Sequence, residues 1–104
     1  MVYSMQPIIP HYDKVCDAFQ KYGVSFAGLF GSRAFGDNTP KSDYDIVIEF
    51  TPRSNISLLG MMELQQKLEK ILGVSVDLVT KEDISPYIRE SVLSSVIPFY
   101  GQKN

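Results

Sequence analysis

Residues 29–50 constrain the fold of this 104-residue chain more than any other stretch. An apolar run ends at Phe30, the pair Gly31-Ser32 follows it directly, and after ten intervening residues Asp43-Tyr44-Asp45 opens a second apolar run. Gly, Asp, Asn and Pro crowd the intervening segment, as is typical of turns and loops. The stretch therefore predicts a strand, a tight Gly-Ser turn, a short helix or loop, and a second strand that carries two carboxylates.

The remaining patterns predict a small α/β domain. Apolar runs and alternation predict strands over 24–30, 43–50 and 74–80, and a short edge strand within 96–104. Apolar residues at helical spacing predict helices over 10–22, 57–72 and 83–95. We expect a two-layer sandwich of a small mixed β-sheet with the helices packed on one face. It should form one domain over 1–104, with ragged ends at 1–8 and 101–104.

Specific residues are expected to delimit these helices. Pro10 suits the first position of its helix, and Ser57 and either Asp83 or Ser85 are candidate N-caps. Gly23 and Gly73 are expected to end helices in the left-handed conformation. The apolar stripe of the second helix is expected to pack into the core; its members are Leu58, Met61, Met62, Leu64, Leu68, Ile71 and Leu72.

Composition narrows the function classes. The net charge is −2 and the pI about 5.2, so the chain lacks the basic footprint of a nucleic-acid-binding protein. No apolar run approaches the length of a membrane helix and no leader pattern opens the chain, so we expect no membrane association and a cytoplasmic location. Cys16 is the single cysteine and His11 the single histidine, which disfavours an internal disulfide, a cysteine zinc cluster and Cys–His or Ser–His chemistry.

The paired carboxylates indicate a metal site. Asp43 and Asp45 are two residues apart on a strand, so both project from one face with Cα atoms about 6.5 Å apart. At about 5 Å, two such charges repel by roughly 3 kcal/mol at an effective dielectric near 20. A divalent cation between them removes this repulsion, and carboxylate oxygens suit Mg²⁺ or Mn²⁺.

Asp77, on the strand predicted over 74–80, would complete the site. If this strand pairs beside 43–50, Asp77 comes within about 5 to 7 Å of the pair. It is then a third metal ligand and a candidate general base, and three carboxylates can hold two metal ions about 4 Å apart. Gly31 and Ser32 are expected to bind phosphate through a close backbone approach and a hydroxyl, with Arg33 or Lys41 offsetting its charge.

The runs GSRAFG (31–36), SDYDIVI (42–48) and VDLV (76–79) resemble the signature of the minimal nucleotidyltransferase branch of the polymerase-β-like superfamily. The resemblance covers roughly 10–97 and implies the nucleotidyltransferase fold. It also implies that Gly31 and Ser32 hold the triphosphate of ATP or another nucleotide, that Asp43 and Asp45 bind Mg²⁺, and that Asp77 completes the metal site and helps to deprotonate an acceptor hydroxyl. Phe35 departs from the family, because many members carry arginine there.

The same resemblance implies a partner. The chain is short for a protein that carries its own acceptor-binding domain, and similar short proteins occur beside HEPN toxins, to which they transfer AMP on a tyrosine hydroxyl as antitoxins. Two alternatives remain open. Phe35 and the apolar helix over 57–72 also fit a non-catalytic module that covers its partner, and a small-molecule nucleotidyltransferase could build its acceptor site at the interface of a homodimer.

Overall fold

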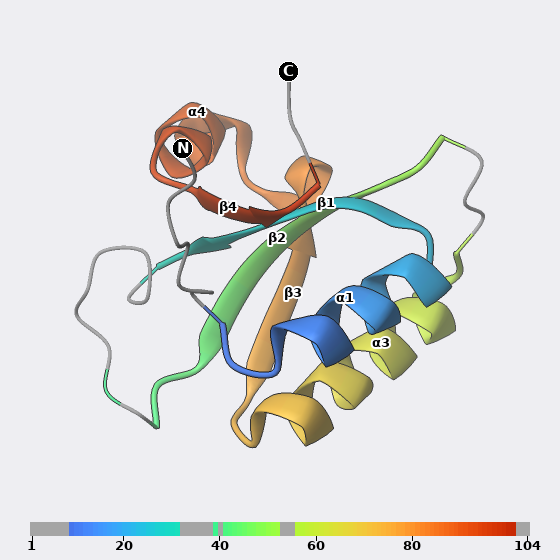
Figure 1. Ribbon diagram of the computed structural model, residues 1–104. Coiled ribbons are helices and arrows are strands. Elements are labelled where there is room, and N and C mark those ends of the chain that lie inside the picture. Colours follow the sequence, from blue (N-terminus) through green and yellow to red (C-terminus); the bar gives the residue numbers. More distant parts are fainter. Residues whose placement is uncertain (1–8, 32–38, 40, 53–55, 102–104) are drawn as a thin grey trace, which may run out of the picture.

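Four strands form one mixed sheet in the computed structural model, which describes residues 9–31, 39, 41–52 and 56–101 (Figure 1). In chain order the strands are β1 (Val24–Phe30), β2 (Tyr44–Phe50), β3 (Val76–Thr80) and β4 (Ile97–Tyr100). Their spatial order is β3-β2-β1-β4. β1 is antiparallel to both β2 and β4, whereas β2 and β3 are parallel.

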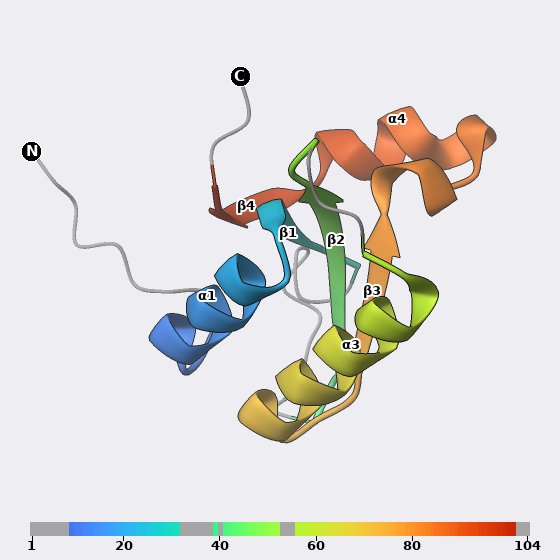
Figure 2. The same ribbon diagram turned by 90° about the vertical axis from the view of Figure 1, so that its right-hand side faces the viewer.

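Two helices, α1 (Tyr12–Lys21) and α3 (Leu58–Leu72), lie side by side on one face of this sheet (Figures 1 and 2). A short 3-10 helix, η1 (Lys81–Asp83), follows β3 and leads into α4 (Pro86–Ser94). Both views place α4 across the sheet from α1 and α3. The predicted sandwich of a mixed sheet and a helical layer is confirmed, and α4 adds partial cover on the second face.

The main core lies between the sheet and the pair α1 and α3. Alternate residues of β2 point into it: Tyr44, Ile46 and Ile48 are buried. Leu64 and Leu68 of α3 meet them and are fully buried, which is worth roughly 1.5–3 kcal/mol for each side chain. The other buried members of this cluster are Ile9, Val15, Ala18, Phe19, Val24, Ala27, Leu29, Val76 and Leu78.

The helix ends follow local sequence signals with one exception. The Ser57 hydroxyl accepts a hydrogen bond from the Gly60 amide at 3.2 Å, and Ser85 caps α4. Gly23 and Gly73 adopt φ values of 78° and 76° at the ends of α1 and α3. Pro10, however, does not start α1: His11 is left-handed with φ 55°, and this breaks the helix between Pro10 and Tyr12.

The first turns of α3 are more exposed than its apolar stripe predicted. Leu58 and Met62 are 79% and 52% exposed, so the expectation that both pack into the core is wrong. The reason is the position of these residues around the helix. Met62 lies about 200° around α3 from Leu64 and Leu58 about 120°, whereas Met61 lies nearer the buried face and packs against the core.

The edge strand β4 is held to α1 by polar and aromatic contacts. The Tyr12 hydroxyl donates to the Phe99 carbonyl at 2.8 Å. The Phe19 ring lies 6.0 Å from that of Phe99 and 5.1 Å from that of Tyr100, centroid to centroid. These contacts explain how a four-residue strand that contains Pro98 keeps its place at the edge, where a missing amide donor is tolerated. In the part of the chain that the structure describes, no helix is long and apolar enough to cross a membrane.

Candidate active site

The strand register brings two of the predicted carboxylates together. In the parallel pair of β2 and β3, Asp45 is the direct partner of Asp77, and neighbouring strands lie about 4.8 Å apart. On the other side of β2, Asp45 faces Phe30, the last residue of β1. The expectation that the Asp77 strand pairs beside 43–50 is therefore confirmed.

These carboxylates face away from the α1 and α3 layer. Their chain neighbours Tyr44, Ile46, Val76 and Leu78 are buried in the main core, and successive strand side chains point to opposite faces. Asp45 is half-buried and Asp77 is exposed. Asp43 directly precedes β2 and is exposed as well, so the three carboxylates lie at one end of the second face.

Gly31 closes this end of the sheet against Asp45. It directly follows β1 and has a φ of 71°, a conformation that costs other L-residues of order 1–2 kcal/mol. A Cβ atom at this position would overlap Oδ2 of Asp45. Gly31 thus provides both the turn and the room for the carboxylate. The other predicted phosphate-binding residues, Ser32 and Arg33, lie outside the described residues, as does Phe35.

The electrostatics of the site are unbalanced. Burial raises the pKa of Asp45, and the negative charges of Asp77 and Asp43 raise it further. Among the described residues, none donates a hydrogen bond or offers a cation to the Asp45 carboxylate. A cation bound between these carboxylates would offset their uncompensated negative charge.

The donor set suits a hard divalent cation, although the described side chains do not form a finished cage. Three carboxylates offer only oxygen atoms, which Mg²⁺ prefers, together with phosphate oxygens and water. The described part of the chain contains no group of three His, Cys, Asp or Glu side chains already gathered at metal-binding distances. A cation here would therefore depend on rotation of a carboxylate and on further oxygen atoms from a ligand or from water.

An open pocket of about 420 Å³ adjoins Gly31, and the sequence interpretation missed its second wall. Phe30 and Gly31 form one side, and Ser91, Ser94 and Ser95 of the α4 segment line the other. The Ser94 and Ser95 hydroxyls donate to the carbonyls of Ser91 and Val92, each at 2.9 Å, which leaves their lone pairs free to accept. The three serines at helical spacing were the signal for this polar face, but only the fold places α4 here.

Comparison with known proteins places this geometry in a family. Residues 12–98 match the model of the nucleotidyltransferase domain. A protein of Methanocaldococcus jannaschii named "putative protein adenylyltransferase" is 45% identical over 78 residues, which cover 74% of this chain and 78% of the relative. Protein adenylyltransferase MntA of Thermococcus cleftensis is 38% identical over 78 residues, which cover 75% of this chain and 77% of MntA.

Solved structures agree with this fold. A structure described as a "putative minimal nucleotidyltransferase" is 33% identical, with a TM-score of 0.70 over 84% of this chain and 87% of that one. One chain of a mutant MntA toxin–antitoxin complex is 26% identical, with a TM-score of 0.68 over 88% of this chain and 72% of that one.

Proposed function

Because this chain belongs to the nucleotidyltransferase domain family, we propose that it transfers AMP from ATP to a hydroxyl group on a partner protein. The partner that fits best is a HEPN-type toxin, for which the protein acts as the antitoxin. Nucleotide transfer is the activity of the family; the donor nucleotide, the acceptor hydroxyl and the catalytic residues are what we propose for this chain.

Two lines of similarity support a protein acceptor. Relatives that are 38% and 45% identical over about three quarters of the chain carry the name protein adenylyltransferase. The structure of an MntA toxin–antitoxin complex matches 88% of the chain at 26% identity. Neither relative's name implies a nucleic-acid acceptor. A net charge of −2 also disfavours binding of a negatively charged nucleic acid.

The observation that carries the proposal is the register of Asp45 beside Asp77, with Gly31 packed against the Asp45 carboxylate. On this reading Asp43, Asp45 and Asp77 hold Mg²⁺, or Mn²⁺ in its place. Gly31, Ser32 and Arg33 bind the triphosphate. The metal ion, when bound, neutralises the phosphate charge and orients the α-phosphate for in-line attack.

The chain's own residues would then guide the transfer. The acceptor oxygen forms a bond to the α-phosphorus as the bond from that phosphorus to the oxygen bridging to the β-phosphate breaks. Pyrophosphate leaves with that oxygen and its electron pair. The proton of the acceptor hydroxyl passes to the Asp77 carboxylate, which is exposed at the edge of the site and so open to a partner.

The test is transfer of label from ATP to the partner. The protein is incubated with α-labelled ATP, Mg²⁺ and the product of the adjacent gene, and label on that product is followed by electrophoresis and mass spectrometry. We expect label on a tyrosine, with loss of at least about a hundredfold in Asp45→Asn and in Asp77→Asn.

Asp13→Asn is the matched control, because Asp13 is an exposed carboxylate on α1, which covers the other face of the sheet. It should retain full transfer. Unlabelled partner under all conditions, or equal labelling by the Asp45→Asn variant, would refute the proposed activity.

A further inference from the structure

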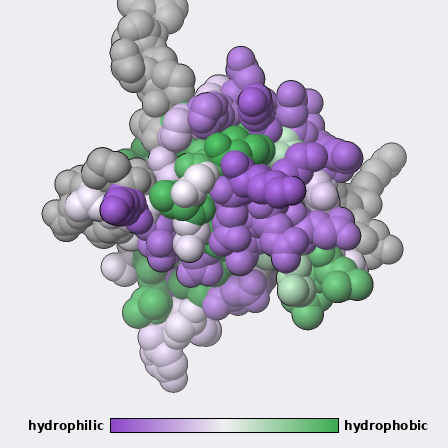
Figure 3. Space-filling model, turned by 90° about the horizontal axis from the view of Figure 1, so that it is seen from below, coloured by the Kyte–Doolittle hydropathy of each residue, from purple (hydrophilic) through white to green (hydrophobic). Residues whose placement is uncertain are grey.

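A second charged feature lies across the sheet from the carboxylates, in the groove between α1 and α3. Hydrophilic side chains dominate this face of the molecule (Figure 3). Three of the chain's ten Lys and Arg residues, Lys14, Lys21 and Lys67, line one groove of about 320 Å³. The net charge of the whole chain is −2, so these three lysines form a local concentration of positive charge on a negatively charged protein.

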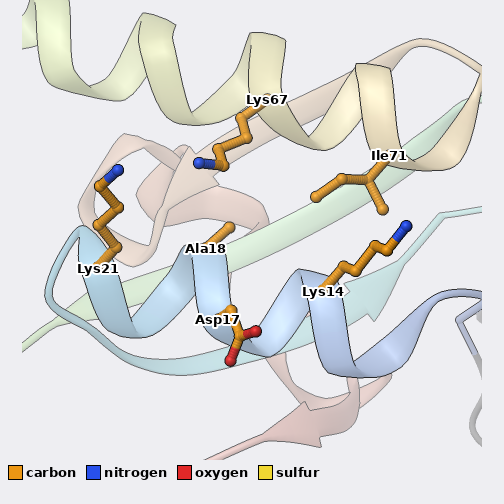
Figure 4. A pocket seen from close by; sticks show the side chains of 6 residues that line it. All are labelled: Lys14, Asp17, Ala18, Lys21, Lys67 and Ile71. Atoms are coloured by element: carbon orange, nitrogen blue, oxygen red, sulfur yellow. The ribbon is translucent and has the colours of Figure 1, made fainter.

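The lysines converge on the groove from both walls. Lys14 and Lys21 point from α1 toward α3, and Lys67 points from α3 toward α1 (Figure 4). Asp17 also lines the groove and is within one helical turn of both α1 lysines, but its carboxylate points away from α3. No described residue forms an ion pair or hydrogen bond with the three ammonium groups.

The carboxylates of α3 make their own hydrogen bonds. Glu63, one turn before Lys67, accepts a hydrogen bond from the Tyr22 hydroxyl at 3.5 Å. Glu69 accepts one from the Val76 amide at 3.0 Å. The residues that line the groove comprise three lysines and one aspartate, so the lining carries net positive charge.

The floor of the groove is apolar. Ala18 is buried between the two α1 lysines, and Ile71 of α3 lies opposite Lys14. A small residue at position 18 leaves the space over α1 shallow and open. The groove therefore combines an apolar floor with a cationic rim, which is the complement of an amphipathic acidic helix.

We propose that the α1–α3 groove is a docking site for an acidic amphipathic helix of a partner protein. Lys14 and Lys21 are seven residues apart, or about 10.5 Å along α1, which matches carboxylates seven apart on one face of a second helix. Charge complementarity identifies the occupant: glutamate or aspartate side chains meet the three lysines, and one aliphatic side chain rests on Ala18 and Ile71.

A long polyanion fits this surface less well. The net charge of the chain is −2, so a phosphate backbone that continued past the three lysines would run over a surface of net negative charge. The docking site also does not depend on nucleotide transfer, because it lies on the face of the sheet opposite Asp45 and Asp77.

Binding of a designed peptide tests the docking site directly. The probe is a fluorescent, end-capped helical peptide of about 15 residues, with glutamates seven positions apart and a leucine between them. A peptide of the same composition in shuffled order is the control. Fluorescence anisotropy should show binding to the full chain that prefers the ordered peptide and weakens as salt rises, because salt screens exposed ion pairs.

Charge reversal locates the site. The double variant Lys21→Glu with Lys67→Glu should weaken binding about tenfold or more, since it replaces two attractive pairs by repulsive ones. Lys70→Glu with Lys81→Glu makes the same charge change outside the groove and should alter binding by less than about threefold. Circular dichroism checks that both variants keep their helix content.

Three results would overturn the docking site. The first is failure of the ordered peptide to bind at low salt, and the second is an equal loss of affinity in both double variants. The third is binding of a single-stranded oligonucleotide or inorganic tripolyphosphate in the groove while the peptide does not bind. The last result would identify the groove as a polyanion site instead. Because no arm of the experiment contains ATP, failure here leaves the transfer reaction untouched.

Discussion

Replacing Asp45 by asparagine should stabilise the protein while abolishing nucleotide transfer. Asp45 is the register partner of Asp77 and is half-buried. Two charges about 5 Å apart repel by roughly 3 kcal/mol at an effective dielectric of 20 and by about 0.8 kcal/mol in water. Because Asp77 is exposed, the lower end applies, and we expect Asp45→Asn to raise the free energy of unfolding by about 1 kcal/mol.

The pH dependence of this gain has a definite sign. Burial and the negative charges of Asp77 and Asp43 raise the pKa of Asp45 in the folded chain above its ordinary value. The folded state therefore binds a proton more readily than the unfolded state, and the carboxylate destabilises the fold in full only above the raised pKa. As the pH falls through the raised pKa to below the ordinary value of about 4, the difference between wild type and variant should vanish.

Urea unfolding followed by circular dichroism, at neutral pH and near pH 3, measures both effects. At neutral pH a gain of about 1 kcal/mol corresponds to a Tm rise of roughly 4–8 °C for a domain of this size. Asp13→Asn, which removes an exposed carboxylate from α1, should leave stability within about 0.5 kcal/mol of wild type. A less stable Asp45→Asn variant, or a difference that does not change with pH, would refute the claim that the carboxylate is uncompensated.

Mg²⁺ provides a second readout of the same carboxylates. If Asp43, Asp45 and Asp77 hold the ion, it binds only the folded state and should raise the Tm of the wild type. Asp45→Asn removes one ligand, so the rise should shrink or disappear. Equal rises in the two proteins would place any Mg²⁺ binding elsewhere.

The remaining predictions concern the turn, a helix cap and the edge strand. Gly31→Ala should cost about 1–2 kcal/mol for its positive φ and should also lower transfer by displacing the Asp45 carboxylate; an active, equally stable variant would contradict this. Ser57→Ala removes the hydrogen bond from the Gly60 amide and should lower unfolding free energy by about 1 kcal/mol, whereas Ser57→Asp should not. Tyr12→Phe loses the bond to the Phe99 carbonyl and should cost about 0.5–1.5 kcal/mol, with faster amide exchange in β4 but not in β2.

Much of the fold followed from short-range patterns. The strand over 24–30 was predicted to the residue, because glycines bound a continuous apolar run there. Ser57, Gly23 and Gly73 act as predicted because capping depends on a few consecutive residues. The start of α1 was missed by two residues, since the left-handed conformation of His11 has no sequence signal.

An error arose where the apolar stripe of a helix is wider than the face that packs. Leu64 and Leu68 of α3 are buried and Met61 packs against the core, whereas Leu58 and Met62 are exposed. Met62 lies about 200° around the helix from Leu64 and Leu58 about 120°. An apolar side chain outside the core-facing arc stays exposed unless another element covers it.

The sequence by itself predicted the family and the candidate carboxylates of this protein. Asp43 and Asp45 were recognised from a spacing of two residues, which matches the strand period, although Asp43 directly precedes β2 rather than lying in it. The family signature and the Gly-Ser turn are likewise local, and the comparisons confirm the nucleotidyltransferase domain.

Only the tertiary structure decided which distant residues meet. The parallel register sets Asp77 beside Asp45, the close approach at Gly31 fits the turn to that carboxylate, and α4 brings Ser91, Ser94 and Ser95 to the same end of the sheet. The packing of α1 on α3 likewise gathers lysines from two helices into one groove. These arrangements depend on strand pairing and helix packing between segments far apart in the chain, which local periodicity does not encode.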